Sequence, residues 1–239
     1  MKRWSNAKIA TKLFVVLLLP VLGLAAFSGK MVNDCRADLR SFKVQQRSVE
    51  FLAALGQLVH ELQKERGRSA GFLGSRGVQF GAELSAQHAV TDTNLGAYLT
   101  TQAGLPAELL AGDLGKRLAQ LSDALAGLKI KRGEVLQIAI TSAQSSAFYT
   151  ATIANALEVI DLAAKSASNG ELAVSVATYV NFLRAKELNG QERAALSGVF
   201  ASDKFSAEAL AKFNRIISGQ DAYLQVFRSF ADREEVKFY

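Results

Sequence analysis

Apolar residues recur at helical spacing through most of the chain after residue 30. Steps of three and four residues place such side chains on one helix face, and the clearest seam extends over about three heptads. Its members are Leu52, Leu55, Val59, Leu62, Arg66, Ser69 and Leu73. A second, less apolar seam comprises Leu172, Val176, Tyr179, Leu183, Lys186, Gly190, Arg193, Ser197 and Phe200. The alternating β-branched runs typical of strands do not occur past Lys30. The pattern therefore predicts an all-α protein.

Glycine, proline and polar residues divide this pattern into six predicted helices. We expect breaks at Gly77, at Gly104 before Pro106, at Arg132-Gly133, at Asn169-Gly170 and at Ser202-Asp203. The predicted helices cover residues 31–75, 79–101, 106–128, 132–167, 170–202 and 206–235. Long helices with short connections predict an elongated antiparallel helical bundle. No low-complexity linker interrupts it, so residues 31–239 are expected to form one helical domain.

The segment before the bundle is strongly apolar. Leu13 to Phe27 reads LFVVLLLPVLGLAAF, and residues 13–29 reach the short end of the length that spans a bilayer as a helix. The basic residues among positions 1–12 predict a cytoplasmic N-terminus. Two interpretations stay open: a transmembrane anchor, and a cleaved signal peptide with Ala26-Phe27-Ser28 as the small-x-small site. Both place residues 31–239 outside the cytoplasm, so we expect a single-pass protein of a bacterial inner membrane with a periplasmic or extracellular domain.

The positive net charge belongs to the N-terminus. The chain carries a formal charge of +6, but residues 1–30 hold five basic and no acidic residues, and the other 209 residues hold 23 basic and 22 acidic ones. The body is thus nearly neutral, which argues against the phosphate-tracking surface of nucleic-acid binders. We predict no nucleic-acid partner.

Cysteine and histidine are too scarce for several kinds of site. The one cysteine, Cys35, excludes a disulfide framework within the chain, and it is open whether this residue pairs between subunits or is an inert thiol. Only His60 and His88 are available to a histidine-based metal centre. No Ser/His/Asp, Cys/His or paired-carboxylate arrangement suggests catalysis. We expect a non-enzymatic protein without metal or cofactor.

Two arginines occupy positions that the seams assign to the packed face. Arg66 and Arg193 have no carboxylate three or four residues away on their own helices, and the adjacent Glu65 and Glu192 are directed about 100° away. A buried guanidinium keeps its proton and needs an anion or water.

Small neutral residues flank both arginines, and Gly67, Gly71 and Gly190 leave room for a compact guest. Two facing guanidiniums would bind a planar monovalent oxyanion through charge-assisted hydrogen bonds. The alternative is that each arginine pairs with an acid of another helix, for which Asp92, Glu134 and Glu158 are the candidates.

Two stretches of the sequence resemble the nitrate- and nitrite-sensing (NIT) domain. Leu58 to Gly77, LVHELQKERGRSAGFLGSRG, is similar to the family's Leu-Gln-x-Glu-Arg-Gly-x-Ser stretch, and Lys186-Glu187 through Glu192-Arg193-Ala194 is similar to its second motif. The resemblance covers about residues 45–235 and implies an all-helical sensor of nitrate or nitrite, as found in bacterial chemoreceptors and other regulators. It implies that Arg66 and Arg193 bind the anion.

The combined evidence predicts an extracytoplasmic, chemoreceptor-like sensor that transmits a helix shift to the membrane. Ser69, Ser197 and Asn189 are further candidate ligands, with small polar packing as their alternative role. We expect a homodimer that is held to the membrane by its N-terminal helix. Such a receptor would continue into a second transmembrane helix and an output module, so this chain would be its sensor part or a shortened relative. A structural or protein-interaction bundle without a small ligand is the competing hypothesis.

Overall fold

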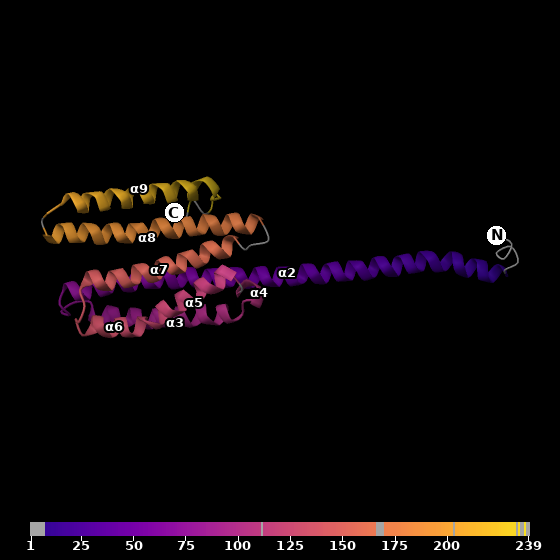
Figure 1. Ribbon diagram of the computed structural model, residues 1–239, viewed down its shortest axis with the longest axis horizontal. Coiled ribbons are helices and arrows are strands. Elements are labelled where there is room, and N and C mark those ends of the chain that lie inside the picture. The colour runs from indigo at the N-terminus through magenta and orange to yellow at the C-terminus, as the bar shows by residue number, and fades with distance from the viewer. Residues whose placement is uncertain are drawn as a thin grey trace. The chain divides into compact units, whose positions relative to one another are not determined.

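The computed structural model describes residues 8–110, 112–165, 170–202, 204–232, 234 and 237. Every regular element in these residues is a helix (Figure 1). The elements are α2 (Ile9–Gly74), α3 (Gly81–Ala103), α4 (Ala107–Leu110), α5 (Gly112–Ala126), α6 (Leu128–Leu136), α7 (Ser142–Lys165), α8 (Gly170–Ser202) and α9 (Ala207–Phe230). The prediction of an all-α fold is confirmed.

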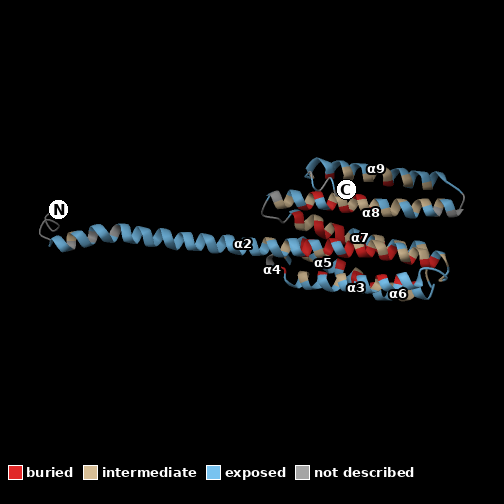
Figure 2. Cartoon of the chain, turned by 180° about the vertical axis from the view of Figure 1, so that it is seen from behind, coloured by how far each residue is buried: buried red, intermediate tan, exposed pale blue. Residues whose placement is uncertain are grey.

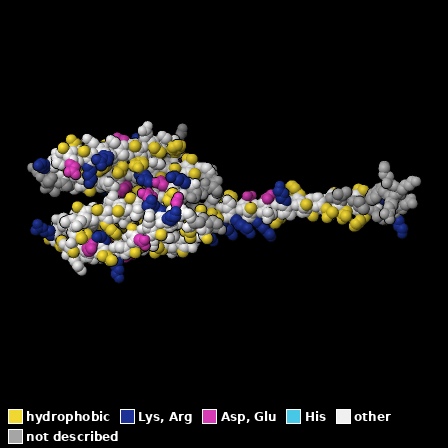
Figure 3. All heavy atoms as spheres, in the orientation of Figure 1, with side chains coloured by type: hydrophobic (Ala, Val, Ile, Leu, Met, Phe, Trp, Pro, Cys, Tyr) yellow, Lys and Arg dark blue, Asp and Glu magenta, His cyan; other side chains and the backbone are white. Residues whose placement is uncertain are grey.

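The chain separates into two compact units, residues 1–46 and 47–239. In the first unit, α2 runs without interruption through the predicted boundary between residues 29 and 31. All its side chains from Pro20 to Val44 are exposed, and Figure 3 shows hydrophobic atoms along the N-terminal part and basic ones beyond it. Among the described helices, only this one is long and apolar enough to cross a membrane, a property that it shares with signal sequences. Most of the predicted cytoplasmic segment, residues 1–12, lies outside the described residues.

The second unit is a helical bundle built around the C-terminal part of α2 and around α7. Figures 1 and 2 show these two helices in the middle, with α3, α5 and α6 on one side and α8 and α9 on the other, and the buried residues gather where they meet. Leu55, Val59 and Leu62 of the first seam are completely buried, as is Leu58 beside them. Apolar burial of this kind is the main stabilising force of a fold, so the seam read from the sequence is the centre of the core.

The predicted breaks are correct in part. Gly77 lies in a turn after α2 with φ 79°, a left-handed conformation that favours glycine. Gly104 follows α3, and α8 ends at Ser202. Asn169 lies outside the described residues. The predicted break at Arg132-Gly133 is wrong, because both residues lie within α6 and the chain leaves helical structure only after Leu136.

Contacts between α2 and α8 show that these two helices run in the same direction. The Tyr179 hydroxyl packs against Gly56. Farther along both helices, Lys186 Nζ lies 2.7 Å from His60 Nδ1. The neighbouring helices α2 and α3, α7 and α8, and α8 and α9 run antiparallel (Figure 1), as in a bundle with short connections, whereas α6 continues the direction of α5 after the single residue Gly127. The parallel pairing brings the two motifs of the sequence, on α2 and on α8, to the same level of the bundle.

Candidate functional site

Arg66 of α2 is buried and forms a forked ion pair with Glu187 of α8. Its Nη1 atom donates to Glu187 Oε1 at 2.5 Å, and its Nη2 atom donates to Oε2 at 3.2 Å. The Nη1 atom also donates to Thr150 Oγ1 of α7 at 2.8 Å. The guanidinium therefore joins three helices. Its two terminal nitrogens bind the carboxylate in a bidentate arrangement, which gives strong, oriented hydrogen bonds.

The Glu187 carboxylate has two further donors. Gln63 Nε2 donates to Oε2 at 3.0 Å, and Gln191 Nε2 donates to Oε1 at 2.9 Å. Arg66 fits here because position 190 is a glycine: a Cβ atom there would lie 2.7 Å from Arg66 Nη2. The small residue that flanks the second motif thus makes room for the arginine of the first.

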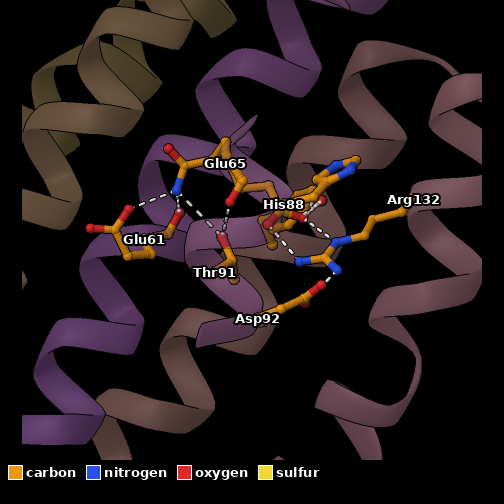
Figure 4. Close-up of polar contacts among 8 residues, drawn as sticks. Glu61, Glu65, His88, Thr91, Asp92 and Arg132 are labelled. Carbon is orange, nitrogen blue, oxygen red and sulfur yellow. Dashed lines mark hydrogen bonds and ion pairs between the residues drawn. The ribbon is translucent and has the colours of Figure 1, made fainter. Parts of the chain in front are cut away.

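The neighbouring Glu65 is buried on a different side of α2, in a second ion-pair cluster (Figure 4). Arg132 of α6 donates to its two oxygens from Nε at 2.8 Å and from Nη2 at 2.9 Å, and Tyr149 of α7 donates at 2.7 Å. Arg132 also donates to Asp92 of α3 at 2.6 Å. Burial alone would raise the pKa of Glu65, but the hydrogen bonds from Arg132, Thr91 and Tyr149 outweigh it and hold that pKa below its ordinary value.

This second cluster continues along α3. Gln87 donates to Glu61 Oε2 at 2.6 Å, and His88 Nε2 lies 3.7 Å from Glu65 Oε1 (Figure 4). Burial lowers the pKa of His88 by more than the carboxylates of Glu65 and Asp92 raise it. The His88 side chain is only 15% exposed, so it belongs to this cluster rather than to the open surface.

The structure does not bring the five predicted site residues together. Arg66 and Ser69 are buried, whereas Arg193, Asn189 and Ser197 are exposed. The Ser197 hydroxyl donates to the backbone carbonyl of Arg193 at 2.8 Å. The structure thus pairs Arg66 with a carboxylate and exposes Arg193, and the binding of an anion by both arginines stays a prediction. Glu187 supplies the counter-ion of Arg66, while Arg193, six residues farther along α8, is turned by about 240° from it.

The acid that pairs with Arg66 is not among the three candidates from the sequence. Asp92 pairs with Arg132, Glu134 with Lys131, and Glu158 with Arg117. Glu187 stands in the second motif, directly after Lys186, and the motif could have suggested it. In the described part of the chain, no group of three histidine, cysteine or acidic residues is arranged to hold a metal ion.

Comparison with known proteins matches the chain to a nitrate-sensing family. The model of the family described as "Nitrate and nitrite sensing" matches residues 57–239. The "Nitrate regulatory protein" of Klebsiella oxytoca is 27% identical over 208 residues, which cover 84% of this chain and 52% of that protein. The structure of the NasR transcription antiterminator is similar with a TM-score of 0.78 and 25% identity over 87% of this chain and 57% of that one. The chain spans little more than half the length of these relatives.

These relatives overturn one prediction. The similar proteins are a nitrate regulatory protein and a transcription antiterminator, so the expected extracytoplasmic chemoreceptor that signals through the membrane is wrong. The expectation that no nucleic acid is a partner finds no support in a relative that acts in transcription antitermination.

Proposed function

The chain belongs to the nitrate and nitrite sensing family, and we propose that residues 47–239 are the nitrate- or nitrite-binding sensor of a regulatory protein. The relatives are named for nitrate regulation and for transcription antitermination, and both are longer than the part that this chain matches. We propose that binding changes the packing of the bundle and that this change is the regulatory signal.

The burial of Arg66 and its pairing with a planar carboxylate are the observation that carries this proposal. The Arg66 guanidinium is permanently charged and buried, and its two terminal nitrogens face the two oxygens of a planar carboxylate, that of Glu187. Nitrate and nitrite present two oxygens in a similar plane with the same charge as a carboxylate. The Thr150 hydroxyl, 2.8 Å from Arg66 Nη1, is a second group within reach of such an anion.

We propose that Arg193 contributes the second positive charge. It follows Gly190, which faces Arg66, by three residues, or about 4.5 Å of helix rise. Because its side chain is exposed, it is not held by the bundle core and is free of the burial that fixes Arg66. An anion at Arg66 would attract it from the edge of α8.

Calorimetric titration of the full chain with sodium nitrate and sodium nitrite tests the function, with sodium chloride as the control salt. We expect heat with nitrate or nitrite and none with chloride. Arg66→Lys should abolish the heat, since it keeps the charge but loses the fork, while Arg68→Lys on the same helix should not. Absence of binding by the folded wild type would favour the structural bundle, in which Glu187 is merely the permanent partner of Arg66.

We also propose that the N-terminal part of α2 attaches the protein to a membrane. The support is an apolar, fully exposed helical run that would be unfavourable in water. Fractionation of expressing cells tests this: we expect the chain in the membrane fraction after an alkaline wash. A shortened chain in the soluble fraction, with a new N-terminus near Ser28, would indicate a cleaved signal peptide instead.

A homodimer is the last element of the proposal. Cys35 is exposed and is a free thiol on the exposed part of α2. Mild oxidation of the full chain should produce a dimer on a non-reducing gel that Cys35→Ser lacks. A monomeric mass in solution by light scattering would contradict the homodimer.

A further inference from the structure

We propose that Glu187 is a built-in competitor for the anion site, which must leave Arg66 before nitrate can occupy it. This inference rests on the proposed function, since it concerns how the same site is controlled. The second motif then has a role beyond that of Arg193. It also carries Glu187, the acid that occupies the anion site until the ligand displaces it.

The carboxylate of Glu187 and a bound oxyanion would occupy the same position. Glu187 uses both oxygens on the terminal nitrogens of Arg66, at 2.5 and 3.2 Å. A planar oxyanion that binds the same fork would lie where the carboxylate lies. Two negative groups at this distance would repel each other strongly in a buried site, so one must displace the other.

Glu187 keeps other hydrogen bonds when its ion pair with Arg66 breaks. Gln63 and Gln191 donate to its two oxygens, and Gln191 stands one turn farther along the same helix. These neutral donors belong to half-buried side chains and stay available to a carboxylate that moves toward the edge of the interface. The displaced acid therefore does not have to remain buried without partners, which would be prohibitively unfavourable.

The exchange of Glu187 for the anion alters a contact between α2 and α8. The Arg66–Glu187 pair joins α2 to α8, whereas the Arg66–Thr150 bond joins α2 to α7. Replacing Glu187 by a free anion breaks the first link and leaves the second. Several α2–α8 contacts near this level are polar or involve a glycine: Lys186 with His60, Arg66 with Gly190, and the bond from Gln63, which can follow the displaced Glu187. The exchange therefore gives α8 a second arrangement relative to α2, as a two-state sensor requires.

A quantitative consequence follows for affinity. If most molecules hold the closed pair, the apparent dissociation constant of nitrate is raised by the inverse of the fraction that is open. Removing the charge of Glu187 removes this competition. We expect Glu187→Gln to bind nitrate at least about tenfold more tightly than the wild type.

Nitrate titration of four full-length proteins tests the inference: wild type, Glu187→Gln, Glu187→Asp and Glu192→Gln. Glu192→Gln removes the same charge from the same helix, but Glu192 is bonded to Gln220 of α9 at 2.7 Å and not to Arg66. We expect a tenfold or greater gain for Glu187→Gln and a smaller gain for Glu187→Asp, whose shortened acid reaches the fork less well. Glu192→Gln should stay within about twofold of the wild type, because the Glu192 carboxylate is bonded to Gln220 and does not occupy the fork of Arg66.

Each outcome decides between the two proposals. Arg66-dependent binding by the wild type that neither Glu187 variant tightens would overturn the competition and leave the proposed function standing. An equal gain in Glu192→Gln would also overturn it, because the effect would then be one of general charge. Binding that appears only in the Glu187 variants would support the competition. No binding by any of the four folded proteins, checked by circular dichroism, would reject both proposals. Should Glu187→Gln fail to fold, Glu187→Asp decides alone.

Discussion

Glu65 and Arg66 are neighbours in the sequence, yet they lie on different sides of α2 and have different roles. Glu65 is completely inaccessible to solvent and is held by Arg132 and Tyr149 from the side of α6 and α7. Arg66 is almost as buried, but its partner Glu187 lies at an interface where a glycine and two glutamines surround the pair. One residue step, about 100° of helix rotation, separates the two environments.

These two environments show how one level of a helical bundle can combine a rigid side with a side that responds to a ligand. The Glu65 cluster combines charged residues of α2, α3 and α6 (Glu65, Asp92 and Arg132) with the Tyr149 hydroxyl of α7, and Glu65 is completely buried, so the cluster fixes α6 and α7 to α2. In the Arg66–Glu187 pair, Gln63 and Gln191 also donate to Glu187, and Arg66 also donates to Thr150. Each partner therefore keeps hydrogen bonds when the ion pair breaks. We therefore expect substitutions in the first cluster to reduce stability and substitutions around the second to change ligand response.

The largest expected effect is that of Glu65→Gln. It leaves Arg132 buried against a neutral amide, and removing one partner of a buried ion pair typically costs about 3–5 kcal/mol of unfolding free energy. Urea unfolding followed by circular dichroism measures it. Glu134→Gln is the matched control: its partner Lys131 lies on the same helix turn and the pair is partly exposed, so the loss should stay below about 1 kcal/mol. Equal losses in both variants would contradict the special status of Glu65.

Much of this arrangement was predictable from the sequence, because it follows from local spacing. Steps of three and four placed Leu55, Leu62 and Arg66 on one face, and that face is buried. The two motifs identified the family, which the match over residues 57–239 confirms. Helix rotation also correctly separated Glu65 from Arg66, which have different partners.

The partners of the buried charges could not be predicted, because they come from distant parts of the chain. Arg66 and Glu187 are 121 positions apart, and Arg132 and Glu65 are 67 apart. The expected break at Arg132-Gly133 failed for a related reason. A lone Gly133 weakens a helix by only about 1 kcal/mol, and the ion pairs of Arg132 with two other helices favour the observed turn of α6.

A pair of glycine substitutions separates helix propensity from the fit of Arg66. Gly67→Ala has open space around the new methyl group and should stabilise α2 by about 0.5–1 kcal/mol. Gly190→Ala places its methyl group 2.7 Å from Arg66 Nη2, so the gain in propensity is offset by displacement of the guanidinium. We expect Gly190→Ala to be about 1–2 kcal/mol less stable than Gly67→Ala in urea unfolding. Equal stability would mean that Arg66 moves away without loss.

A smaller effect concerns pH and the Glu65 cluster. Burial holds the pKa of His88 below its ordinary value of 6.5, so the unfolded chain takes up a proton at a higher pH than the folded one does. Stability should therefore fall as the pH is lowered through 6.5 toward the pKa of the folded state, and it should be regained on return. His88→Gln should flatten this dependence. His60, whose pKa is also lowered by burial, would account for the part that stays. An unchanged slope in His88→Gln would contradict a neutral, buried His88.

The smallest effect on stability should come from Arg193→Ala, and this variant tests most directly what α8 contributes to anion binding. The Arg193 side chain is exposed, so its loss should change the unfolding free energy by less than about 0.5 kcal/mol without nitrate. If Arg193 supplies the second charge to the bound anion, the same variant should lose most of the stabilisation that nitrate gives the wild type, since ligand binding stabilises in proportion to affinity. Arg215→Ala, an exposed arginine on α9, is the control and should keep that stabilisation. Urea unfolding with and without nitrate measures both quantities. Full nitrate stabilisation in Arg193→Ala would leave Arg66 as the sole arginine of the site, and with it the view that α8 contributes to sensing through Glu187 alone.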